Sequence, residues 1–346
     1  MKKVVSILAT VAVIGGAFLY KTGALNALMD SNGGKAEENV ETLLSKESEA
    51  MVAKLAPFVT CINSVDGAWR GAYARYQTAY ENQVTKGNAF WNLQTRFTLA
   101  QHGDQYAIAK SCIEGLNAGV KNGQSDPELD ALGTEYAQTL QQLIPLVQSV
   151  DTYYSQGDYK DDGMAKGKAL QAQIAPLFKT FFAKSDRIHS LVASRNLAIE
   201  KQALTAMEQR NGKDIWWHTE NVMLEARGVI DAIDALNTQD RLTVENLQPL
   251  ETAYQQALET AKAYGEANRA KSEGKTAADP FWFYLEPNAS ALLANVKALR
   301  RDLGKGKNAD LERNYNNMIN SFNRLVDEYN NRNQARNRYI ASMNKG

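Results

Sequence analysis

Apolar side chains recur every three or four positions along most of this chain. A helix has 3.6 residues per turn, so side chains at these steps lie along one face of it. The first such stripe is Leu55, Phe58, Ile62, Val65, Trp69, Tyr73, Tyr76 and Tyr80. Comparable stripes lie within residues 90–120, 129–154, 164–207, 215–236, 247–264 and 311–329. The pattern predicts an all-α protein, an elongated antiparallel helical bundle of about eight helices.

Short segments rich in Gly, Asn and Pro mark the expected helix ends. Lys86-Gly87-Asn88 and Asn211-Gly212 interrupt the apolar pattern. Ser125-Asp126-Pro127 indicates a helix start, because a capping side chain precedes a proline whose missing N–H is not needed there. Residues 271–287 contain two prolines and no clear stripe, so we expect an irregular segment that ends where Asn288 caps the next helix.

The N-terminus resembles an export signal. Lys2 and Lys3 precede Val4 to Tyr20, a run of seventeen residues without a charge. As a helix this run would span about 25 Å, slightly less than the hydrocarbon core of a bilayer. Either a peptidase cuts after Ala24, or the segment stays as a membrane anchor; a buried N-terminal helix is the remaining alternative.

The expected domain organisation follows from these features. Residues 1–24 form the signal peptide or membrane anchor, residues 25–39 a flexible tether, and residues 40–346 a helical bundle domain that could divide near residue 211. Cleavage and anchoring both place the bundle outside the cytoplasmic membrane. We therefore expect a periplasmic protein, attached to the inner membrane through residues 4–20 if they are not cleaved.

The charge balance excludes one class of partner. Lys plus Arg and Asp plus Glu each number 39, so the formal net charge is zero. Proteins that bind nucleic acids need a basic surplus or a basic stripe to neutralise phosphates. We therefore expect no nucleic-acid partner.

The two cysteines are placed symmetrically about an expected turn. Cys61 lies 26 residues before Gly87, and Cys112 lies 25 residues after it. Positions equally far from the turn of an antiparallel helical hairpin lie at the same height, and an exported compartment permits oxidation. The spacing predicts a Cys61–Cys112 disulfide; the alternative is two separate buried thiols.

Catalytic and metal-binding motifs are scarce. The three histidines form no H-x-x-x-H or H-E-x-x-H pair, and the chain has no G-x-S-x-G, P-loop or dinucleotide motif. The nearest fragment is Asp186 with His189 one helical turn later, a spacing that we interpret as a packing or surface pair. We therefore assign no catalytic, cofactor-binding or metal-binding residue.

Two segments are candidates for a partner surface. Residues 153–162 are rich in Tyr and Asp; they could bind a partner or a cation, or simply connect two helices with acids at a helix N-terminus. Residues 280–284 are a run of aromatic side chains after a proline; exposed, they would mark a binding surface, and folded inward they would close the end of a bundle. The candidate residues are Tyr154, Tyr159, Asp161, Asp162 and Trp282.

Several segments resemble a known family. They are Tyr153-Tyr154 followed by Tyr159-Lys160-Asp161-Asp162 and Ala165-Lys166-Gly167-Lys168, then Cys61-Ile62-Asn63, Cys112 and the stretch Leu325 to Asn330. In these segments the chain resembles the YiiG-like family of bacterial envelope proteins, an uncharacterised helical family with lipoprotein members. The resemblance implies an envelope location and a helical fold, and it brings no known activity. This chain lacks the lipobox Cys of the lipoprotein members.

The leading functional hypothesis is a non-enzymatic binding or scaffold protein of the periplasm or envelope, with an unknown protein partner. It depends on long apolar stripes without a polar constellation. The alternatives are a helical bundle that binds a small ligand or a metal, and an unrecognised hydrolase.

Overall fold

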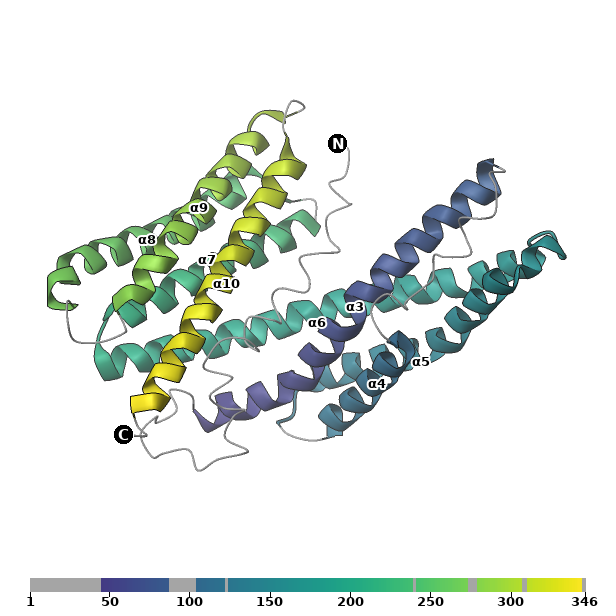
Figure 1. The fold of residues 1–346 in the computed structure, drawn as a ribbon, viewed down its shortest axis with the longest axis horizontal. Helices are drawn as coiled ribbons and strands as arrows, with labels where there is room; N and C mark the ends of the chain where they lie inside the picture. Colours follow the sequence, from purple (N-terminus) through teal and green to yellow (C-terminus); the bar gives the residue numbers. More distant parts are fainter. Residues whose placement is uncertain are drawn as a thin grey trace. The chain divides into compact units, whose positions relative to one another are not determined.

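Helices account for nearly all of the described chain (Figure 1). The computed structural model describes residues 45–86, 104–121, 124–238, 241–272, 279–306 and 310–343. These residues form eight α-helices and one 3-10 helix, with no strand among them. They are α3 (Lys46–Lys86), α4 (Gln105–Lys121), α5 (Pro127–Gln156), η3 (Asp158–Lys160), α6 (Ala165–Asn211), α7 (Ile215–Thr238), α8 (Val244–Ser272), α9 (Asp279–Leu303) and α10 (Leu311–Met343). The all-α prediction is confirmed.

The chain divides into two compact units, and the boundary lies inside α6. The N-terminal unit is Glu47–Ser194, and the C-terminal unit contains Arg195–Gly346. The sequence suggested a division near residue 211, where α6 ends. The last turns of α6 belong with the C-terminal unit because they contact α7: Glu200 Oε1 lies 2.5 Å from Arg227 Nη1.

Aromatic rings dominate the core of the N-terminal unit. The predicted stripe on α3 is buried from Leu55 to Tyr76, with no member more than 8% exposed. The Trp69 ring centroid lies 6.3 Å from those of Phe178 and Phe181 on α6. The Tyr73 and Phe178 rings stack at 4.1 Å. The stripe on α3 is therefore buried against α6.

The helix α5 starts where Asp126 and Pro127 predict it. Asp126 has extended backbone angles, and its side chain accepts a hydrogen bond of 3.2 Å from the backbone N–H of Leu129. Pro127 is the first helical residue, where no N–H donor is required. Gly157 ends the helix with φ at +80°, a conformation that glycine adopts without steric cost.

The helix α9 corrects the sequence reading. It begins at Asp279, so the expectation of an irregular segment up to residue 287 is wrong for its last part. Pro280 lies in the first turn, where proline is tolerated, and Pro287 removes only one internal hydrogen bond. Burial of Trp282 and Leu285 on the core side stabilises these turns.

The C-terminal unit contains a four-helix bundle of α7, α8, α9 and α10. Each helix contacts the next one along the chain, and α10 also contacts α7, which closes the bundle. Its buried core is apolar and includes Ile233, Tyr254, Leu292 and Phe322. None of the helices within the described residues is long and apolar enough to cross a membrane. The expected signal or anchor and the tether lie outside the described residues.

Candidate functional site

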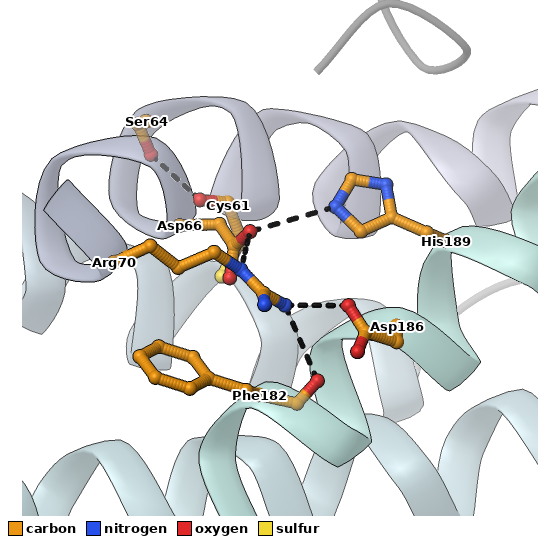
Figure 2. Close-up of polar contacts among 7 residues, drawn as sticks. All are labelled: Cys61, Ser64, Asp66, Arg70, Phe182, Asp186 and His189. Atoms are coloured by element: carbon orange, nitrogen blue, oxygen red, sulfur yellow. Dashed lines mark hydrogen bonds and ion pairs between the residues drawn. The ribbon is translucent and has the colours of Figure 1, made fainter. Parts of the chain in front are cut away.

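A polar cluster of the N-terminal unit lies between α3 and α6 (Figure 2). Asp66 and Arg70 are one turn apart on α3, so both point from the same face of that helix. Phe182, Asp186 and His189 recur at steps of four and three on α6, which places them on one face as well. Figure 2 shows the two sets of side chains pointing toward one another.

Arg70 is the centre of this cluster. Its Nε donates a hydrogen bond of 2.6 Å to Asp66 Oδ2, and its Nη2 donates one of 2.6 Å to Asp186 Oδ1. The same Nη2 donates a 3.2 Å hydrogen bond to the carbonyl oxygen of Phe182. The guanidinium carbon lies 4.6 Å from the centroid of the Phe182 ring. A planar guanidinium with several fixed donors suits this arrangement, whereas a lysine ammonium would satisfy only part of it.

Asp66 is a buried carboxylate that stays charged. Its side chain is 1% exposed, and burial, the largest influence, raises its pKa. The nearby His189 side chain, the charge of Arg70, the nearby Ser185 side chain and the hydrogen bond from Arg70 lower it, so that the pKa ends below its ordinary value. His189 Nε2 lies 3.9 Å from Asp66 Oδ2. The negative charge is therefore held in place by groups on both helices.

This cluster consists of ion pairs and hydrogen bonds that link two helices. Asp186 lies at its solvent edge, with 60% of its side chain exposed, whereas Asp66 lies at its buried end. Across the part of the chain that the structure describes, no group of three His, Cys, Asp or Glu side chains is arranged to hold a metal ion. The sequence named Asp186 and His189 as a pair but gave no sign of their partners on α3.

The predicted disulfide is confirmed. Cys61 and Cys112 are bonded, and their Cα atoms lie 4.6 Å apart. The bond joins α3 to α4 within the N-terminal unit and closes a loop of 51 residues. Both side chains are buried, with 2% and 5% exposed.

The segment rich in Tyr and Asp is a tightly packed connection between α5 and α6. Tyr154 and Tyr159 are 3% and 2% exposed, so the expectation that they form a partner surface is corrected. The Tyr153 hydroxyl donates a 2.7 Å hydrogen bond to Asp162. A Cβ atom on Gly167 would lie 2.8 Å from the Tyr154 hydroxyl and 2.9 Å from the Tyr153 ring, so the close packing of these rings requires glycine.

Asp162 has a structural role at the start of α6. One carboxylate oxygen accepts the backbone N–H of Met164 at 2.9 Å, and the other accepts that of Lys166 at 2.9 Å. These hydrogen bonds, with the one from Tyr153, lower the pKa of Asp162. Asp161 and Asp162 are exposed at this turn, and a partner that contacts them stays a prediction.

The aromatic run at the start of α9 is split between the core and the surface. Trp282 is 2% exposed and packs so closely on Gly265 of α8 that it is corrected from a partner-surface residue to a core residue. Phe283 and Tyr284 are 38% and 48% exposed. The Arg332 guanidinium carbon lies 3.5 Å from the centroid of the Tyr284 ring. The exposure of Phe283 and Tyr284 follows from helical periodicity once the helix is known to begin at residue 279, because both then lie away from the core face that contains Trp282 and Leu285.

The comparisons with known proteins identify the family of this chain. The chain is 22% identical over 307 residues to the uncharacterized protein YiiG of Escherichia coli (strain K12), and the match covers 86% of this chain and 84% of that protein. No solved structure matches the chain. A family model described as "Protein of unknown function (DUF3829)" matches residues 49–331. The resemblance to a YiiG-like family is confirmed, and the chain belongs to the DUF3829 family.

Proposed function

We propose that this chain is a non-enzymatic binding or scaffold protein of the cell envelope, and that it holds a protein partner through the exposed start of α9. The observation that carries the proposal is Tyr284, which is 48% exposed yet held by the Arg332 guanidinium over its ring. Phe283 beside it adds further exposed apolar surface. Tyr and Arg are enriched among the residues that dominate binding energy at protein interfaces. A surface that displays both in a fixed geometry suits a protein partner.

The envelope location has separate support. Disulfides persist in oxidising compartments and are rare in the cytosol, so the Cys61–Cys112 bond favours a chain that is exported. The pair Lys2 and Lys3 before the uncharged run of residues 4–20 has the pattern of an export signal or an anchor.

The location is tested by trapping thiols in growing cells. Acid quenching and alkylation would be applied to cells that express the full chain or a variant without residues 2–24. We expect Cys61 and Cys112 to be protected in the full chain and alkylated in the truncated variant, which stays in the cytosol. Alkylation of both cysteines in the full chain would contradict the envelope location.

The binding surface is tested by a photocrosslinking amino acid at position 284 in intact cells. Position 266, which is exposed on α8, provides the matched control. We expect a discrete protein adduct from position 284 and none of the same mass from position 266. The purified partner should bind the Tyr284→Ala variant at least about tenfold more weakly, because hot-spot truncations cost about 2 kcal/mol. Identical adduct patterns from both positions would refute the proposed surface.

A further inference from the structure

A buried charge cluster joins the last turns of α6 to α7 in the C-terminal unit. Arg227 on α7 is 1% exposed, and its Nη1 lies 2.5 Å from Glu200 Oε1 on α6. Its Nε lies 3.4 Å from Asp231 Oδ2, one turn further along α7. The Glu200 and Asp231 side chains are 16% and 33% exposed, so water screens these charges only in part.

A third carboxylate lies close to this pair of helices. Glu220 on α7 acts on Glu200 electrostatically, and it accepts a hydrogen bond from the hydroxyl of Tyr329 on α10. The charges that act on Glu200 include those of Arg227, Asp231 and Glu220, and of these Arg227 is in direct contact with it. Arg227 carries one positive charge and faces two carboxylates, Glu200 and Asp231, so this partly buried group carries a net negative charge when both are ionised.

Glu200 is the carboxylate at which this negative charge is least stabilised. Its second oxygen, Oε2, is buried and has no hydrogen-bond partner among the described residues. An ionised oxygen without a donor is costly to bury, whereas a protonated carboxyl group loses much less on leaving water. Burial is the largest influence and raises the pKa of Glu200, and the charges of Asp231 and Glu220 raise it further, whereas the charge of Arg227 lowers it. The resulting pKa is about 7. Burial raises the pKa of Asp231 as well.

We propose that Glu200 is a proton-binding site, and that its protonation stabilises the packing of the last turns of α6 on α7 as the pH falls through neutrality. The folded cluster holds this proton more tightly than the unfolded chain, in which an ordinary glutamate has a pKa near 4.5. The stabilisation is present in mild acid and is lost as the pH rises through about 7. Between pH 8 and pH 6 it amounts to about a tenfold change in the local opening equilibrium.

Hydrogen exchange of the full chain at pH 8 and pH 6, corrected for intrinsic exchange rates, tests this device. In the wild type, we expect peptides from residues 197–211 and 220–236 to open about tenfold less at pH 6 than at pH 8. Glu200→Gln, which mimics the protonated acid, should remove most of this difference and protect both peptides at pH 8. Glu266→Gln, a change at an exposed glutamate of α8, should behave as the wild type.

Two results would overturn the proposal. One is a wild type whose exchange in these peptides does not depend on pH, and the other is a Glu200→Gln variant that keeps the wild-type dependence. Asp231→Asn provides a second variant should Glu200→Gln fail to fold. Removing the Asp231 charge should lower the pKa of Glu200, so the protection should begin at a lower pH than in the wild type; an unchanged onset would also count against the proposal.

Discussion

Replacing Arg70 by Gln removes the central group of the polar cluster between α3 and α6. The variant loses the hydrogen bonds to Asp66, Asp186 and the Phe182 carbonyl, together with the contact to the Phe182 ring. The larger effect is on Asp66, whose carboxylate is 1% exposed and would keep only its contacts with α6. Removing one partner of a buried ion pair leaves an uncompensated charge and costs about 3–5 kcal/mol. We expect a loss of that size in the stability of the N-terminal unit.

A matched control uses a second arginine that links helices of the same unit. Arg187 on α6 pairs with Glu128 on α5, and their side chains are 55% and 48% exposed. An exposed ion pair contributes about 0–1 kcal/mol, so Arg187→Gln should have little effect. Urea unfolding of the full chain, followed by hydrogen exchange in peptides from residues 47–194, would compare the two variants.

The pH dependence gives a second check on the same reasoning. Arg70 contributes to lowering the pKa of Asp66 through both its charge and its hydrogen bond, so Arg70→Gln should raise that pKa. Acid would then neutralise Asp66 in the variant, while the wild-type carboxylate stays charged to a lower pH. We therefore expect the loss to be smaller at pH 4 than at pH 7, and the double variant Asp66→Asn, Arg70→Gln to recover part of it. The reasoning is refuted if Arg70→Gln costs no more than Arg187→Gln, or if the double variant is no more stable than the single one.

Further variants test packing and titration elsewhere. A Cβ on Gly265 would lie 2.9 Å from Trp282 Cδ1, so Gly265→Ala should destabilise the C-terminal unit by about 1–3 kcal/mol in urea unfolding. Gly228→Ala, where no atom lies within 4 Å, should stabilise the same unit by up to about 1 kcal/mol. Burial raises the pKa of Asp151 to about 6, although a hydrogen bond from Tyr106 lowers it. Its proton therefore stabilises the N-terminal unit in acid, and Asp151→Asn should flatten the fall in stability between pH 4 and pH 7 that hydrogen exchange would report.

The helix ends that the sequence predicts correctly depend on local interactions. Asp126 caps α5 through a hydrogen bond to a residue three positions later, and Pro127 follows it directly, so the sequence displays both signals. The start of α9 depends instead on tertiary packing. Two prolines favoured an irregular segment, and burial of Trp282 against Gly265 of α8 stabilises a helix there, which no local signal reveals.

Of the two features that link α3 to other helices, the sequence predicts the disulfide but not the polar cluster with α6. The disulfide was predictable because Cys61 and Cys112 lie 26 and 25 residues from Gly87, where the sequence predicts a turn, and such spacing predicts a similar height in a helical hairpin. The partners of Arg70 on α6 are more than a hundred residues away, and no single turn relates the two helices.

The sequence around Arg70 also does not indicate that this side chain has a distant partner. It lies four residues after Asp66, and such a pair can satisfy itself along one exposed helix. The same holds for Asp186 and His189, whose spacing suits an ordinary surface pair. Only burial distinguishes the real situation, because a carboxylate at 1% exposure depends on the charged and polar groups packed around it, whereas an exposed carboxylate is solvated by water. Whether Asp186 and His189 form a surface pair or join the polar cluster with α3 therefore depends on the axial position of α6 relative to α3. Side-chain packing between the two helices determines that position.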